Sequence, residues 1–251
     1  MAPLLSLTRV TKRYVDRRRE TLVLDDVSLH IDEGDFVGMW GPKRSGKSTL
    51  LRVMAGIVQP DSGDVRFAGR QVQTMSTRER ARLLRCGGIG LVNPEWRPQI
   101  IRPAVELVAF ACTSDGTPMP EAKARARGAL ERVGATECAD VWADQLSLGE
   151  RLRVVLALAL VREPRLLLVD EPAVLPSPLE ADELYRLLRS LGEDRHLAVV
   201  VASENLAASA GALRTMAVSS GEVRSTDEQG VLLRFPAPSG PRSSRADDAR
   251  P

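Results

Sequence analysis

Short apolar runs alternate with amphipathic helical segments along most of the chain. Residues 35–40, 89–92, 166–169 and 197–202 are the clearest of these runs, and a turn or a helical stretch separates each from the next. Runs of this length, bounded by turn residues, are typical of strands. Strands that alternate with helices predict a mainly parallel sheet covered on both faces, because parallel strands need a crossover between them.

Three segments depart from this alternation. Residues 4–67 contain short apolar strands joined by turn residues, for example at 61–64. Residues 105–143 favour helices, with a break rich in Gly, Thr and Pro at 114–120. The tail at 235–251 is rich in Pro, Ser, Arg and Ala, which is typical of a disordered segment.

Composition narrows the class of protein. The formal net charge is +2 and aromatic residues make up 4%, so neither electrostatics nor base stacking argues for a nucleic-acid partner. Cys86, Cys112 and Cys138 are widely spaced and form no C-x-x-C pair, which favours a reducing cytosol. No secretory signal is visible, and no apolar run approaches the roughly 20 residues that span a bilayer. We therefore expect a soluble chain that reaches a membrane only through a partner.

The strongest candidate for chemistry follows the first of the predicted strands of the parallel sheet. The segment from Gly41 to Thr49 fits G-x-x-x-x-G-K-[ST] and stands between a predicted strand and a predicted helix, as a phosphate-binding loop requires. Its glycines allow successive N–H groups to face one anion, and the helix dipole adds positive potential. Lys47 would neutralise the outer phosphates and the Ser48 hydroxyl would bind Mg²⁺. The predicted contacts are Gly41, Pro42, Lys43, Arg44, Ser45, Gly46, Lys47, Ser48 and Thr49.

A second half of the site is predicted where residues 166–169 end in Asp170-Glu171. Acidic strand ends are commonly just solvated, but downstream of a phosphate loop this one becomes its expected partner. Asp170 would hold Mg²⁺, largely through water, and Glu171 would polarise the attacking water. Glu171 and Lys47 are therefore the predicted catalytic residues.

With these motifs in place, residues 4–224 resemble ATP-binding-cassette (ABC) ATPase subunits. The segment from Leu146 to Glu150, Leu-Ser-Leu-Gly-Glu, is similar to the family signature, and Tyr14 stands where the family has an aromatic residue that stacks on adenine. Residues 75–83 and 126–134 make the resemblance strongest to the lipoprotein-release and macrolide-export type.

The resemblance implies an α/β fold with a P-loop NTPase (RecA-like) core. An N-terminal antiparallel β subdomain and an inserted α-helical subdomain, at about 94–148, would belong to one ATP-binding domain at 1–234, followed by the tail at 235–251.

The resemblance also implies partners. Two such subunits face head to tail, so that Ser147, Gly149 and Glu150 of one would face the ATP held by the other. The second subunit would be an identical or a different cassette. ATP and Mg²⁺ are the implied cofactors, and separate transmembrane permease subunits would hold the chain at the inner face of the cell membrane.

The chain departs from the family at the position of the switch histidine. Ser203 occupies this position, and a short hydroxyl can neither span the distance to the γ-phosphate nor carry positive charge. His196 precedes the same predicted strand and lies seven residues before Ser203, which corresponds to roughly 20 Å in extended chain. Because His30 lies in the N-terminal β region, neither histidine is expected to replace the missing one.

Other departures lie near the same site. Asn93 stands in place of a glutamine that touches Mg²⁺, Ser177 in place of a loop aspartate, and Leu148 in place of the first signature glycine. Lys43 and Arg44 stand where small residues are usual; they would contact phosphate, pair with an acid of the partner, or simply be solvated.

Two functions follow from this pattern. The first is the ATP-binding subunit of an ABC transporter, with hydrolysis slowed by the departures and coupled to movement of the membrane subunits. The alternative is a degenerate regulatory or scaffolding subunit that binds ATP with little turnover.

Overall fold

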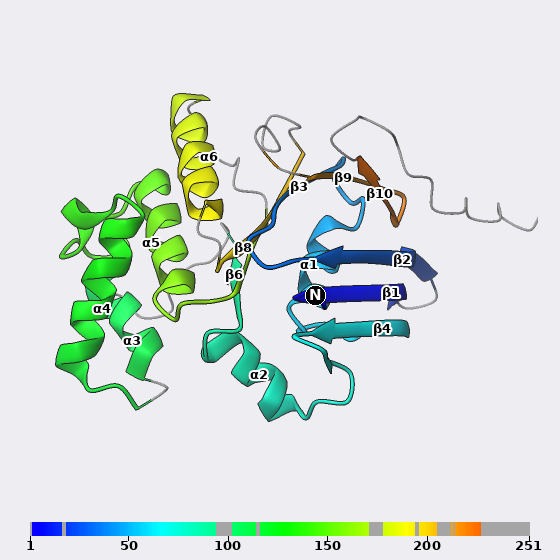
Figure 1. Cartoon of the computed structure of the whole chain (residues 1–251). Coiled ribbons are helices and arrows are strands. Elements are labelled where there is room, and N and C mark those ends of the chain that lie inside the picture. Colours follow the sequence, from blue (N-terminus) through cyan, green and yellow to red (C-terminus); the bar gives the residue numbers. More distant parts are fainter. Residues whose placement is uncertain are drawn as a thin grey trace, which may run out of the picture.

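The computed structural model describes residues 2–16, 19–93, 102–113, 116–170, 178–193, 196–204, 212 and 214–226. The predicted tail at 235–251 lies outside these ranges. Within them, the strands form two sheets (Figure 1).

The larger sheet has the order β10-β9-β3-β8-β7-β6. Its strands are β3 (Phe36–Trp40), β6 (Ile89–Val92), β7 (Leu166–Asp170), β8 (Ala198–Ser203), β9 (Arg214–Ser219) and β10 (Glu222–Thr226). All neighbouring pairs are parallel except β9 and β10, which form an antiparallel hairpin. The predicted parallel sheet is confirmed, whereas the hairpin at its edge was not among the strands that the pattern predicted.

The smaller sheet is the predicted antiparallel β region. Its order is β2-β1-β4-β5, formed by β1 (Leu5–Asp16), β2 (Arg19–Ile31), β4 (Ser62–Phe67) and β5 (Arg70–Gln71). The pairs β1–β2 and β1–β4 are both antiparallel, and both contain register shifts.

The α-helices lie on both faces of the larger sheet. Alternate side chains of its central strands are therefore buried on opposite faces. The helices are α1 (Lys47–Met54), α2 (Thr77–Arg85), α3 (Ala104–Thr113), α4 (Met119–Arg132), α5 (Leu148–Leu160) and α6 (Pro178–Gly192), with a short 3₁₀ turn η1 (Thr136–Cys138). None of the helices in the described ranges is long and apolar enough to span a membrane.

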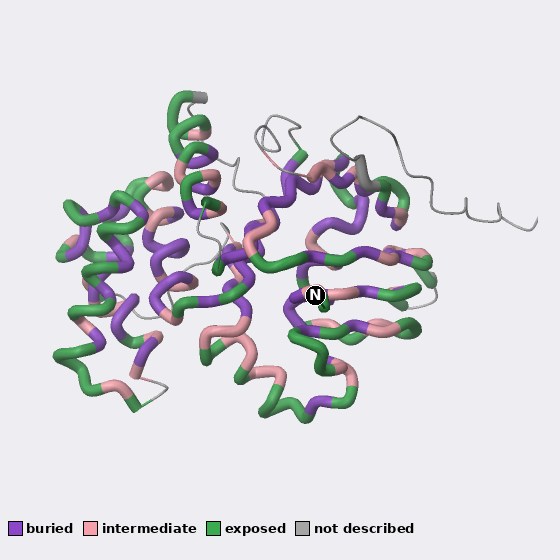
Figure 2. The backbone as a smooth tube through the Cα atoms, viewed as in Figure 1, coloured by how far each residue is buried: buried purple, intermediate pink, exposed green. Residues whose placement is uncertain are grey.

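Two apolar cores lie on opposite faces of the larger sheet. On β8, Val199 and Val201 belong to the core shared with α3, α4, α5 and α6, while Val200 and Ala202 belong to the core shared with α1 and the antiparallel sheet. The central strands β3, β7 and β8 consist almost entirely of buried residues, which are purple in Figure 2. Apolar packing on both faces thus stabilises the sheet, and with it the carboxyl ends of its strands.

Helices α3 and α4 pack on each other and on α5, at one side of the molecule (Figure 1). The predicted helical subdomain at 94–148 includes residues 94–101, which lie outside the described ranges.

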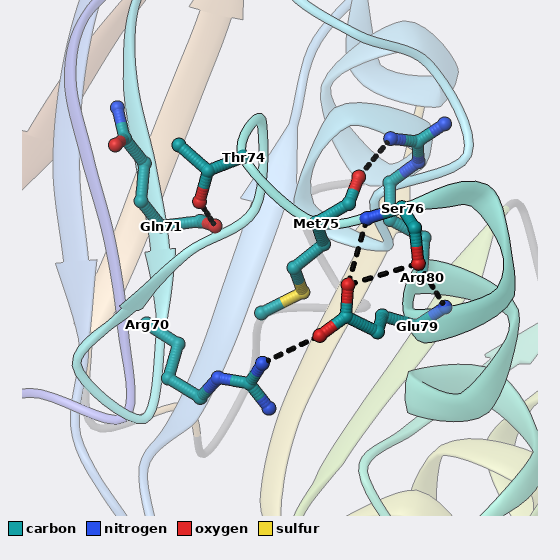
Figure 3. A network of polar contacts seen from close by, with 7 residues as sticks. All are labelled: Arg70, Gln71, Thr74, Met75, Ser76, Glu79 and Arg80. Atoms are coloured by element: carbon teal, nitrogen blue, oxygen red, sulfur yellow. Dashed lines mark hydrogen bonds and ion pairs between the residues drawn. The ribbon is translucent and has the colours of Figure 1, made fainter.

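Helix α2 buries none of its own residues, so its ends contribute much of its local stability. Ser76 and Glu79 form a capping box: the Ser76 hydroxyl accepts the Glu79 N–H, and the Glu79 carboxylate accepts the Ser76 N–H at 2.8 Å. Arg70 pairs with the same carboxylate at 3.0 Å, and Arg80 donates to the Met75 carbonyl (Figure 3).

Replacing Ser76 with alanine should loosen α2 locally. An N-cap serine contributes about 1 kcal/mol, so we expect the amides of α2 to exchange hydrogen about fivefold faster. Thr74→Ala is the control, because Thr74 donates only to the Gln71 carbonyl in the preceding turn. Equal exchange rates in Ser76→Ala and the wild type would contradict the capping role.

Candidate nucleotide-binding site

The Gly41–Thr49 loop connects β3 to α1 at the carboxyl edge of the larger sheet. Gly46 has φ 109°, a left-handed conformation that favours glycine, and its carbonyl accepts the Leu50 N–H at 2.8 Å to begin α1. Because β3 lies between β8 and β9, the loop emerges near the middle of the sheet. Ligands bind at this edge in open α/β sheets.

Three other segments hold the loop in place. The Gly41 N–H donates to the Ser203 carbonyl at 3.2 Å, and the Gly221 N–H donates to the Ser45 carbonyl at 3.3 Å. A Cβ on Gly41 would lie 2.1 Å from the Val218 carbonyl oxygen, and one on Gly46 would lie 2.7 Å from that of Val23. The loop is therefore fitted between the end of β8, the β9–β10 hairpin and β2.

Lys47 is the buried charge of the loop. Its ammonium donates to the Gly41 carbonyl at 2.7 Å and to the Pro42 carbonyl at 3.0 Å, and the residue is only 5% exposed. A buried ammonium is retained only where oxygen atoms surround it. A phosphate in the loop would supply further oxygen atoms to the same group.

Ser48 and Asp170 come together from elements far apart in the sequence. The Ser48 hydroxyl donates to the Asp170 carboxylate at 3.1 Å, which joins the first turn of α1 to the end of β7. A hydroxyl and a carboxylate are the hard oxygen donors that Mg²⁺ prefers, and Mg²⁺ usually adds waters and substrate phosphates. The pair thus fits the ion that the sequence predicted.

Asn93 directly follows β6, whose Val92 pairs with Val169. The register sets Asn93 at the same edge as Asp170, one strand away. Asn93 also lines a groove of about 400 Å³ together with Ile57, Leu84 and Arg162. The predicted catalytic Glu171 and the loop residue Ser177 lie outside the described residues.

Tyr14 lies near the end of β1, opposite Thr21 of β2. The residue is 40% exposed, and the Lys12 ammonium lies 5.6 Å from the centroid of its ring. Val23, two residues beyond Thr21, is the residue whose carbonyl approaches Gly46. Tyr14 is therefore carried by the strand pair that packs against the phosphate loop.

The signature residues begin a helix. Ser147 is the N-cap of α5, where its hydroxyl accepts the Glu150 N–H at 3.3 Å and the Glu150 carboxylate accepts the Ser147 N–H at 2.8 Å. Gly149 lies in the first turn, and a Cβ there would meet no atom of the described residues within 4 Å. Glycine weakens a helix by about 1 kcal/mol relative to alanine, and the packing around Gly149 offers no reason for one.

Pro42, Lys43 and Arg44 are the exposed part of the loop, whereas Ser45 is buried. Arg44 has φ 63°, a left-handed conformation that strains a residue with a Cβ. At Arg44 the loop therefore has a backbone conformation that suits glycine, and the exposed side chain at this position is a cation.

Ser203 ends β8 and is fully buried. Its hydroxyl lies 3.5 Å from the Tyr185 hydroxyl of α6, and its carbonyl accepts the Gly41 N–H. His196 precedes β8, at the opposite edge of the sheet from Ser203, and His30 lies on β2 beside Arg214. A buried pair of hydroxyl groups, from Ser203 and Tyr185, thus lies at the end of β8, and the replacement of the switch histidine by Ser203 stays a prediction.

Several residues that build the site were missed by the sequence reasoning. Val23, Val218 and Gly221 contact the loop through their backbones, and Tyr185 lies beside Ser203. Backbone contacts leave no signal in the identity of a side chain. Only the Ser-Gly dipeptide at Ser220 had a recognisable turn pattern.

Comparison with known proteins agrees with this geometry. A dimeric ATP-binding cassette solved in a post-hydrolysis state with ADP and Pi has a TM-score of 0.82 and 27% identity, over 90% of this chain and all of that one. Another dimeric structure of the same cassette, described as a bacterial ABC transporter cassette, has a TM-score of 0.79 and 28% identity, over 87% of this chain and 96% of that one.

The curated relatives include both importers and exporters. The chain is 42% identical to an aliphatic sulfonates import ATP-binding protein of Mycobacterium sp. (strain MCS), over 71% of this chain and 65% of that protein. It is 34% identical to a lipoprotein-releasing system ATP-binding protein of Caulobacter vibrioides, over 81% and 89%. It is 33% identical to a macrolide export ATP-binding/permease protein of Burkholderia pseudomallei, over 88% and 34%.

The chain thus spans 65% of the sulfonate relative and 34% of the macrolide relative. The lipoprotein-release and macrolide-export types named from the sequence are both among its relatives. The model of the ABC transporter family matches residues 24–174, which include the phosphate loop, the signature segment and Asp170, and the chain belongs to that family.

Proposed function

We propose that the chain is the ATP-binding subunit of an ABC transporter, which binds ATP with Mg²⁺ and hydrolyses it slowly. The observation that carries the proposal is the fixed loop with buried Lys47 beside the Ser48–Asp170 pair. These groups supply a cation, backbone N–H donors and oxygen ligands within one edge of the sheet.

Each of these residues has a separate task in the proposed reaction. The loop N–H groups would cradle the phosphates, Lys47 would offset their charge, and Glu171 would orient the attacking water. Ser48 and Asp170 would hold Mg²⁺, directly or through water, and Asn93, which follows the strand beside β7, would join them. The ion would supply charge stabilisation to the phosphate oxygens.

A second cassette would complete the site. Gly149 supports this, because a first-turn helical glycine that meets no described residue within reach of a Cβ suits close approach by another molecule. Ser147 and the first turn of α5 would offer the N-terminal end of a helix to the partner's γ-phosphate. Leu148 replaces a glycine in this contact, and Lys43 and Arg44 would face the same interface or solvent.

Membrane subunits would dock at the groove beside Asn93. Ile57, Leu84 and Ala111 give it apolar walls, and it is open between α2, β6 and α3. A permease helix bound there would move with Asn93, one strand away from Asp170. The chain itself would then lie at the inner face of the membrane.

Slow turnover is proposed from the buried Ser203. Its hydroxyl lies beside Tyr185 within the packed core, and a hydroxyl carries no positive charge for the γ-phosphate. We therefore expect a site that binds ATP but lacks one stabiliser of the transition state.

A regulatory or scaffolding subunit is the second candidate, and the same Ser203 favours it. Purification of the native assembly in detergent separates the two functions. Retention of a multi-span membrane protein supports transport, whereas a soluble partner without one supports regulation.

Single-turnover hydrolysis tests the slow-turnover proposal. A general base in an intact site contributes about 10²–10⁴-fold, so Glu171→Gln should abolish activity where the rest of the machinery works. We expect a slow wild-type rate that Glu171→Gln lowers less than about tenfold, because Ser203 leaves the γ-phosphate poorly stabilised. A fast wild-type rate that the substitution abolishes would contradict slow turnover. Asp182→Asn, an acid on α6, is the control.

A further inference from the structure

Asp61, just before β4, fastens β1 over three consecutive residues. Its N–H donates to the Thr11 carbonyl at 2.9 Å. Its carboxylate accepts the Lys12 ammonium at 2.8 Å and the Arg13 backbone N–H at 2.6 Å. One residue of the turn between α1 and β4 thus fixes the backbone and a side chain of β1.

This segment of β1 is irregular. Its pairing with β2 shifts register between Val10 and Lys12 and again between Lys12 and Arg13. Bulges bend a strand and re-aim the side chains that follow, and they are common beside binding sites. The residue that follows this one is Tyr14. Asp61 accepts the Arg13 N–H where the ladder resumes, so it stabilises the irregular pairing directly before Tyr14.

The side chain of Lys12 connects Asp61 to the ring itself. The Lys12 ammonium lies 5.6 Å from the Tyr14 centroid, and its side chain is only 15% exposed. A cation at this distance is attracted to the face of an aromatic ring. With one face of the ring turned toward Lys12, a stacking base has the opposite face available, consistent with the 40% exposure of Tyr14.

We propose that Asp61 is a positioning residue for the base of the bound nucleotide: through Lys12 and the Arg13 N–H, it holds the Tyr14 ring in the orientation that stacks on the base. The inference rests on the proposed ATP-binding function. The hydrogen bond from Lys12 is the largest cause that lowers the pKa of the Asp61 carboxyl below its usual value, which favours the ionised carboxylate that this contact requires.

Binding of ATP and of inorganic triphosphate, each with Mg²⁺, tests the inference on the full chain. Triphosphate has the same phosphates and no base. Asp61→Asn keeps the shape and an acceptor for Arg13 but removes the ion pair with Lys12. We expect about fivefold weaker ATP binding, on the scale of a stacking or cation–π contact, and an unchanged affinity for triphosphate.

Two further variants separate positioning from general damage. Glu20→Gln is the matched control, because it removes the ion pair that Glu20 forms with Arg13 at 3.4 Å on the same hairpin. This substitution should leave the affinities for ATP and for triphosphate unchanged. In Tyr14→Ala, which removes the ring, Asp61→Asn should have no further effect on ATP.

Several outcomes would overturn the inference. In Asp61→Asn, these outcomes are an equal loss of affinity for ATP and triphosphate, or an unchanged affinity for ATP. In Tyr14→Ala, the outcome is a further loss of ATP affinity on adding Asp61→Asn that is as large as the loss in the wild-type background. If the wild type bound triphosphate as tightly as ATP, base stacking would be refuted while the phosphate loop stood. If it bound neither, the proposed ATP-binding function would itself be refuted.

Discussion

Replacing Lys47 with alanine should weaken ATP binding by about 100-fold, which corresponds to about 2.8 kcal/mol. The ammonium is almost fully buried and is held by the carbonyls of Gly41 and Pro42, so its position in the loop is fixed before a ligand arrives. A charge-assisted hydrogen bond to phosphate is roughly twice as strong as a neutral one, and burial strengthens it further. Equilibrium binding of ATP in the presence of Mg²⁺ measures the effect.

Lys43→Ala is the matched control for this prediction. Lys43 is a lysine of the same loop but is exposed to solvent, where its charge is screened. We expect its removal to change ATP affinity by less than about threefold. An equal loss in the two variants would mean that the charge of the loop, and not the buried geometry of Lys47, determines binding.

The second large effect is expected for Gly41→Ala. The new Cβ would lie 2.1 Å from the Val218 carbonyl oxygen and 2.9 Å from the Ser45 hydroxyl. Val218 belongs to β9, which is paired on both sides by β3 and β10, so its backbone cannot retreat without breaking the sheet. We expect the free energy of unfolding to fall by about 3 kcal/mol, as for overpacking against rigid backbone. ATP affinity should fall at least tenfold because the loop must move.

Urea unfolding, with Gly149→Ala as the control, measures the change in stability. A Cβ on Gly149 meets no described atom within 4 Å, and alanine favours a helix over glycine by about 1 kcal/mol. Gly149→Ala should therefore equal or slightly exceed the wild type in stability. Wild-type stability for Gly41→Ala would contradict the close contact between the loop and β9.

Much of the fold could be predicted from periodicity, because burial on both faces leaves a continuous apolar run in the sequence. The strand predicted at residues 166–169 is found as β7, and the one at residues 197–202 as β8, displaced by one residue. The edge hairpin of β9 and β10 could not be found in this way. Its strands are only partly buried, and a weak alternation of apolar and polar residues cannot be told from a loop.

The sequence by itself determined the phosphate loop, because its chemistry depends on residue types at fixed spacing within one segment. It also predicted that Asp170 ends a buried strand, which β7 confirms, and that Ser203 replaces a histidine of the family, which stays a prediction. These properties depend only on neighbouring residues in the sequence, so they can be predicted before the tertiary contacts are known.

Only the tertiary structure decided which residues of distant segments meet. The Ser48–Asp170 contact and the ion pair of Asp61 with Lys12 join elements that are far apart in the chain, and the Ser203–Tyr185 pair joins the consecutive elements α6 and β8. Such contacts depend on strand order and register, which residue types do not encode locally. The sequence therefore specified the groups that would bind phosphate, and the packing of the two sheets decided where the remaining groups stand around them.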